Sequence, residues 1–95
     1  MTSIKIPTPL RAYTGGQAEI TVSGDTVAAV LEDLTGQFPE LRSHLFNDGQ
    51  LRDFVNIFIG DEDIRFRQGL ETGVHSDDRL RIIPSIAGGL VVFVS

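Results

Sequence analysis

The sequence contains no cysteine, and this absence excludes several kinds of chemistry at once. Without thiols the chain has no disulfide bond, no thiolate metal ligand, no cysteine nucleophile and no cysteine-bound iron–sulfur cluster. Tryptophan is also absent, and Lys5 is the single lysine. The first residues lack the apolar segment of a secretory signal peptide. We therefore expect a cytoplasmic protein.

Positive charge and long apolar runs are both scarce. Eight Lys and Arg residues stand against thirteen Asp and Glu residues, which gives a formal net charge of −5. An acidic surface repels phosphate groups, so we expect neither nucleic acid nor an anionic membrane as a partner. No apolar run approaches the ~18 residues that a membrane-spanning helix needs. What remains is one small globular domain, because 95 residues with 41% hydrophobic content can form one core.

Hydrophobic spacing predicts an α+β fold, with one main helix packed across a mixed sheet of four to five strands. The helix covers residues 26–38, because Asp25 or Thr26 can cap its first turn and Pro39 ends it. Strands are predicted at 3–7, 18–22, 54–59, 64–66 and 79–84, with turns at 14–17 and 60–63. We expect the core to contain Val27, Val30, Leu31, Leu34, Ile6, Ile20, Phe58, Leu80 and Ile82.

The motif with the clearest functional meaning follows the last predicted strand. It reads Ile82-Ile83-Pro84-Ser85-Ile86-Ala87-Gly88-Gly89, and Val55-Asn56 and Asp77-Asp78 accompany it. In this order of elements, the motif resembles the closing pattern of the ThiS/MoaD family of ubiquitin-like sulfur carriers. The segments 6–8, 10–11 and 14–17 are similar to one branch, the CysO-type carriers of cysteine biosynthesis. The resemblance covers residues 1–89 and implies a β-grasp fold.

The resemblance implies a protein cosubstrate rather than an enzyme, with no catalytic residue and no bound cofactor of its own. A separate E1-like enzyme would use ATP to adenylate the carboxylate of Gly89, and a sulfur donor would convert it into a thiocarboxylate. Ala87 and Gly88 would thread into partner active sites, because a backbone with small side chains passes through narrow channels. A cysteine synthase-like enzyme would then accept the sulfur.

Six residues, 90–95, follow Gly89, whereas the family uses a C-terminal glycine carboxylate. The resemblance therefore implies a precursor with a domain at 1–89 and an extension at 90–95. A JAMM-type metalloprotease would remove the extension by cutting between Gly89 and Leu90.

Other functions fit the same features. An activated Gly89 could be joined to lysines, as in a ubiquitin-like protein modifier, or the chain could be the small subunit of molybdopterin synthase. If residues 90–95 stay attached, Gly88-Gly89 is a turn before a further strand at 91–94. The chain would then be a β-grasp binding module that is never activated.

The predicted strand 54–59 is apolar on both faces, although only one face can contact the helix. We expect an exposed partner patch that contains Pro7, Ile57, Ile59 and Ile83. The alternative is that a loop or the C-terminal extension covers this second face.

No other group indicates a site. The acids Asp61, Glu62 and Asp63 are expected to be solvated in a turn, and His44 and His75 have no second histidine at metal-binding spacing. We therefore expect no metal site.

Overall fold

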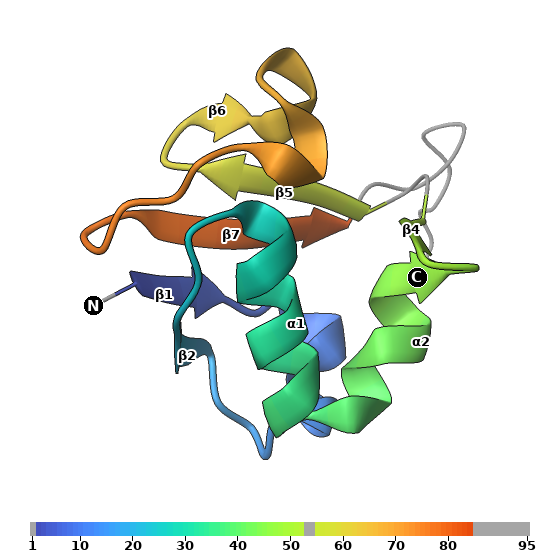
Figure 1. Ribbon diagram of the computed structural model, residues 1–95. Helices are drawn as coiled ribbons and strands as arrows, with labels where there is room; N and C mark the ends of the chain where they lie inside the picture. Colours follow the sequence, from blue (N-terminus) through green and yellow to red (C-terminus); the bar gives the residue numbers. More distant parts are fainter. Residues whose placement is uncertain (1, 53–54, 85–95) are drawn as a thin grey trace.

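The computed structural model describes residues 2–52 and 55–84, and its centre is a mixed five-stranded sheet. The strands lie in the order β2-β1-β7-β5-β6 (Figure 1). The first and last strands are parallel neighbours, and the other pairs are antiparallel. The strands are β1 (Thr2–Lys5), β2 (Glu19–Val22), β5 (Val55–Ile59), β6 (Glu62–Asp63) and β7 (Arg79–Pro84).

The main helix, α1 (Val27–Gln37), lies across one face of this sheet (Figure 1). The Thr26 hydroxyl accepts a hydrogen bond from the backbone N–H of Ala29, which caps the first turn as the sequence predicts. The helix ends before Pro39, because the residue that precedes a proline is disfavoured in helical conformation. The predicted α+β fold with one main helix on a mixed sheet is therefore confirmed.

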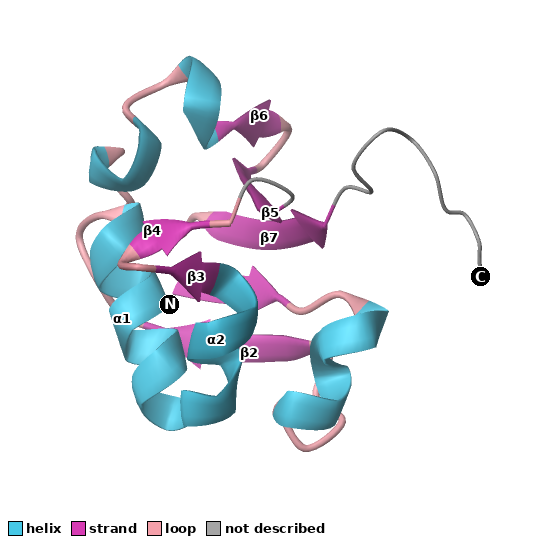
Figure 2. Ribbon diagram, turned by 90° about the vertical axis from the view of Figure 1, so that its right-hand side faces the viewer, coloured by secondary structure: helices cyan, strands magenta, loops and turns pink. Residues whose placement is uncertain are grey.

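The remaining elements are short. The helix α2 (Arg42–Leu45) follows the 3₁₀ helix η2 (Pro39–Leu41), and Figure 2 shows it beside a small hairpin formed by β3 and β4. The hairpin was not predicted, because each of its strands has only two residues. The other short elements are η1 (Thr8–Tyr13), β3 (Phe46–Asn47), β4 (Gln50–Leu51), η3 (Ile64–Phe66) and η4 (Gly69–Glu71).

The core lies between α1 and the inner face of the sheet. Leu31 and Leu34 of the helix have no exposed surface, and they belong to one cluster with residues from four strands. The predicted core residues are buried with one exception. The cluster contains Ile4, Ile6, Ile20, Val22, Val27, Val30, Leu31, Leu34, Leu41, Leu45, Val55, Ile57, Ile59, Ile64, Val74, Leu80 and Ile82.

Two predictions about the β5 region are wrong. Phe58 is half-buried and lies outside the core, because it stands opposite Arg81, whereas Ile57 stands opposite the buried Ile82. The return strand is Glu62–Asp63, and the segment predicted as a strand, Ile64–Phe66, is a 3₁₀ helix. The Asp63 carboxylate accepts a hydrogen bond from the N–H of Arg65 and starts this helix.

Among the helices in the described part of the chain, none is long and apolar enough to cross a membrane.

Candidate functional site

The described chain leaves the sheet at the end of β7, which lies between β1 and β5. Near this end Ile82 points into the core with 3% of its surface exposed, whereas Ile83 is 36% exposed. Pro84 pairs with Val55 and is the last described residue. The predicted site residues Ala87, Gly88, Gly89 and Leu90 lie outside the described residues, so the structure defines the place from which this segment starts.

A first hollow adjoins the end of β7 on the side of β1, with a volume of about 270 Å³. It brings together Pro7 and Ile83, two members of the predicted partner patch. The side chain of Arg11 is fixed beside this hollow, because its Nε donates a hydrogen bond of 3.0 Å to the carbonyl of Ile6. The hollow is lined by Lys5, Ile6, Pro7, Thr8, Arg11, Arg81, Ile82 and Ile83.

A second hollow, which we call the η1–α2 hollow, reaches the same strand end and has a volume of about 630 Å³. Its wall combines apolar side chains from η1 and the sheet with polar side chains from α2 and Arg52. The Arg52 Nε donates a hydrogen bond of 2.9 Å to the carbonyl of Ser43. The lining residues are Pro9, Leu10, Ser43, His44, Arg52, Val55, Ile82 and Pro84.

The predicted partner patch is wrong at two of its four positions. Ile57 is 1% exposed and Ile59 is 8% exposed, and both belong to the core. The register explains this, because Ile57 stands opposite Ile82 and Ile59 stands opposite Leu80, and directly opposed residues share one face of a sheet. Pro7 and Ile83 remain at the surface, half-buried and exposed respectively.

The outer face of the sheet carries a different group beside Ile83. The guanidinium of Arg81 lies 5.6 Å from the ring centroid of Phe58, and it donates a hydrogen bond of 2.7 Å to the carbonyl of Gly60. Asn56 donates a hydrogen bond of 3.1 Å to the carbonyl of Ile83 and accepts one from Arg65. We call Pro7, Phe58, Arg81 and Ile83 the outer-face patch. Phe58 and Arg81 were not predicted as patch residues, although the alternation of Arg81 with Leu80 and Ile82 indicates which face they occupy.

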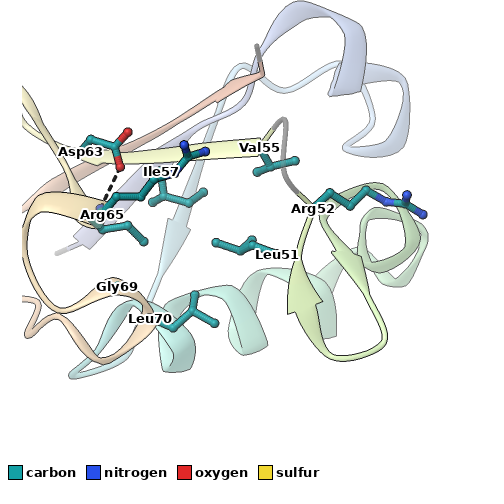
Figure 3. Close-up of a pocket in the computed structure, with 9 residues that line it drawn as sticks. Leu51, Arg52, Val55, Ile57, Asp63, Arg65, Gly69 and Leu70 are labelled. Carbon is teal, nitrogen blue, oxygen red and sulfur yellow. Dashed lines mark hydrogen bonds between the residues drawn. The ribbon is translucent and has the colours of Figure 1, made fainter. Parts of the chain in front are cut away.

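A third hollow of about 490 Å³ lies between β5 and the segment that contains η3 and η4 (Figure 3). Apolar side chains, including Leu51, Val55 and Leu70, line it together with Arg52 and Arg65. The dashed line in Figure 3 marks the 2.8 Å hydrogen bond that Arg65 donates from its backbone N–H to Asp63.

The three acids at positions 61–63, after β5, each interact with a different group. The Asp61 carboxylate lies 3.7 Å from the guanidinium of Arg81, and the Glu62 carboxylate lies 3.5 Å from the Nε of Arg67. The Asp63 carboxylate caps η3. No group of three or more His, Asp or Glu side chains that could hold a metal ion occurs among residues 2–52 and 55–84.

The two histidines have separate surroundings. The ring of His44 packs on that of Tyr13, with the ring centroids 4.2 Å apart, and forms part of the η1–α2 hollow. His75 is exposed, and its backbone N–H donates to the carboxylate of Asp78.

The buried polar side chains of the described body are structural. They are four threonines, and the hydroxyl of each donates a hydrogen bond to a backbone carbonyl. Within the described residues no buried side-chain nitrogen or oxygen lacks a hydrogen-bond partner. This part of the chain therefore offers surfaces and a strand end to other molecules, and its buried polar groups serve the fold. The four buried threonines are Thr2, Thr14, Thr35 and Thr72.

Known proteins are similar to this chain in sequence and in architecture. The model of the ThiS family matches residues 4–89. The sulfur carrier protein CysO of Mycobacterium tuberculosis is 42% identical over 90 residues, which cover 92% of this chain and 97% of that protein. This relative is named as a sulfur carrier, which supports the role of a sulfur carrier for this chain.

Solved structures agree. A chain in the crystal structure of the BexX/CysO complex of Amycolatopsis orientalis is 36% identical, with a TM-score of 0.87; the match covers 94% of this chain and 100% of that one. Small archaeal modifier protein 1 of Methanosarcina acetivorans is 33% identical, with a TM-score of 0.83; the match covers 93% and 95% of the two chains. With its main helix on a mixed five-stranded sheet and a family match over residues 4–89, the chain belongs to the ThiS family.

Proposed function

We propose that this chain carries sulfur as a thiocarboxylate on Gly89, which is formed after residues 90–95 have been removed. The observation that carries the proposal is the family match, which extends to residue 89 and therefore includes the second glycine of the motif. The 42% identity with a protein named as a sulfur carrier supports it. Because that relative is of the CysO type, we also propose cysteine biosynthesis as the destination of the sulfur.

The chemistry requires an activation step, because a carboxylate is a poor electrophile. An E1-like enzyme joins the Gly89 carboxylate to the AMP part of ATP and releases pyrophosphate. Sulfide (HS⁻) released by the sulfur donor then attacks the acyl carbon, AMP leaves, and a thiocarboxylate remains. A cysteine synthase-like enzyme takes the sulfur from it. This chain supplies the acyl group and a body that partners recognise, whereas ATP is bound by the activating enzyme.

We propose that the outer-face patch is the surface that docks on the activating enzyme. Ile83 is an exposed apolar residue next to Pro84, the last residue of β7, and Phe58 and Arg81 lie on the same face. Aromatic and arginine side chains are enriched among the residues that contribute most to protein interfaces. The solved complex of a CysO chain with BexX supports the view that carriers of this kind dock on partner proteins.

The proposal is tested by incubating two forms of the chain with a matched E1-like enzyme, ATP and a sulfur donor. The chain that ends at Gly89 should gain about 16 Da, the difference between sulfur and oxygen in the product of nucleophilic attack on the adenylate. The 95-residue chain should gain nothing, because its Gly89 has no free carboxylate. A Gly89-ended chain that stays unchanged would contradict the carrier function, and a mass gain on the 95-residue chain would contradict the precursor.

A second candidate function is protein modification, favoured by the match to small archaeal modifier protein 1. The same activated Gly89 would then form an isopeptide bond with a lysine amine of a target. A cell extract supplied with the Gly89-ended chain distinguishes the two functions. Modification leaves residues 82–89 attached to target lysines after tryptic digestion, because Arg81 is the last tryptic cleavage site before Gly89, whereas sulfur transfer returns the free carrier.

A further inference from the structure

The η1–α2 hollow is an apolar cavity at the place where the described chain ends. Leu10, Val55 and Ile82 form its apolar wall, with Pro9 and Pro84 at the rim. At about 630 Å³ it is within the range of cavities that hold small ligands, roughly 300–1,000 Å³. An apolar cavity of this size on a small domain is suited to apolar side chains of another segment.

Polar side chains at this hollow offer hydrogen-bond donors to an occupant. The cationic group of the hollow, Arg52, already donates from Nε to the carbonyl of Ser43. A guanidinium has five N–H donors, so the same side chain can also bind a backbone carbonyl of a segment that enters the hollow. The side chain of His44, which also lines the hollow, is held against the ring of Tyr13. A segment with apolar side chains, and with backbone carbonyls that can accept hydrogen bonds from Arg52, therefore matches the hollow.

The chain itself contains such a segment within reach. Residues 90–95 read Leu-Val-Val-Phe-Val-Ser, with five apolar residues and no charge. The five residues 85–89 connect this segment to Pro84, which lines the hollow, and five residues span at most roughly 17 Å when extended. A tether this short keeps residues 90–95 at a high effective concentration beside the hollow.

We propose that the η1–α2 hollow is the seat of residues 90–95, whose apolar side chains bind there until the extension is removed. This seat keeps an aggregation-prone apolar segment out of water. It also holds the Gly89-Leu90 bond beside the body of the domain, and cutting that bond leaves the hollow open. The seat does not depend on sulfur chemistry, so it and the proposed function can fail separately.

The seat is tested with a nitroxide spin label at the end of the extension. Because the chain lacks cysteine, Ser95→Cys provides a single labelling site on the full chain. The methyl signals of Leu10, Val55 and Ile82 should lose most of their intensity to the label and regain it when the nitroxide is reduced. Val22 and Val74 line a separate hollow, and their methyl signals serve as the internal reference.

A matched control has the same tether and the same label but carries Val92→Asp and Phe93→Asp. Both substitutions lie outside the described fold, so the body stays folded and the loss of intensity at the hollow should largely disappear. Leu10→Ser changes the hollow instead of the extension. It removes an apolar lining side chain and should reduce the broadening of the Val55 and Ile82 methyl signals. Equal broadening in the labelled chain and in its aspartate control would overturn the seat.

A mixed sample separates this chain's own extension from that of a second copy. Isotope-labelled protein without nitroxide is combined with nitroxide-bearing protein that has no isotope label. Unchanged methyl signals support binding within one chain. Broadening at Leu10, Val55 and Ile82 in this sample would assign the hollow to a neighbouring copy and would overturn the proposal.

Discussion

The two faces of the central sheet differ in what their side chains do. On the inner face, Ile57 and Ile59 of β5 and Ile82 of β7 are buried in the core. On the outer face, Phe58 and Arg81 are partly exposed and contact each other, and Ile83 is open to solvent. The same two strands therefore supply both a packed core and an accessible surface, one residue apart.

This difference shows where the molecule tolerates change. A core side chain has fixed neighbours on all sides, so a change in its volume or charge is felt by the whole fold. An outer-face side chain has solvent on one side, so its identity is available for recognition by a partner. The comparison predicts that stability and docking separate cleanly between neighbouring positions of β5 and β7.

The largest expected effect is that of Ile59→Asp. An aspartate at a position that is 8% exposed has no cationic partner in the core, and burying an unpaired carboxylate costs at least about 4 kcal/mol. Because small domains have only ~5–15 kcal/mol of stability, we expect the variant to be largely unfolded. Circular dichroism and chemical denaturation measure this.

The matched substitution on the other face is Ile83→Asp. It should change the free energy of unfolding by less than about 1 kcal/mol, because Ile83 is already exposed. It should also weaken docking on the activating enzyme, as measured by calorimetry. A folded Ile59→Asp beside an unfolded Ile83→Asp would reverse our assignment of the two faces.

Leu31→Ala tests the helix side of the core and should have the next largest effect. Leu31 is fully buried, and truncation of such a leucine costs ~2–5 kcal/mol, because it removes apolar contacts and leaves a cavity. Urea denaturation of the wild type and the variant gives the difference directly. A loss well below this range would show that the contact between α1 and the sheet is loose at this position.

Arg81→Ala should have an effect on stability as small as that of Ile83→Asp, about 1 kcal/mol or less. The side chain loses its hydrogen bond to Gly60, its 3.7 Å ion pair with Asp61 and its contact with Phe58, all in partly exposed surroundings that weaken such interactions. Arg81→Lys keeps the charge but not the planar donor group, and it serves as the control. If Arg81→Ala unfolded the domain, the outer face would be structural rather than a recognition surface.

The sequence predicted most of the fold because strong periodic signals specify it. The stripe of α1, its cap at Thr26 and the alternation in β1, β2 and β7 all agree with the structure. Weak signals caused the errors. The strands of the β3–β4 hairpin are too short to show a period. Ile64–Phe66 alternates like a strand but forms a 3₁₀ helix, because Asp63 caps it.

The candidate site was predicted less well than the fold. The face of β5 was assigned incorrectly because its residues are apolar on both sides, and periodicity alone cannot decide such a strand. The pairing of Ile57 with Ile82 settles it, and this long-range contact is set by the sheet as a whole. Pro7 and Ile83 were placed correctly at the surface. The roles of Gly89 and of residues 90–95 remain predictions, because they lie outside the described residues.

The central position of β7 has a mechanical consequence. The strand is bonded to β1 on one edge and to β5 on the other, and β1 runs parallel to it. A force that pulls on Pro84 along the strand loads both rows of hydrogen bonds in shear, so many bonds resist at once instead of opening one by one. An enzyme that pulls on the end of the chain therefore meets high resistance at Pro84. The fold acts as a stop that limits how much of the chain can be drawn in.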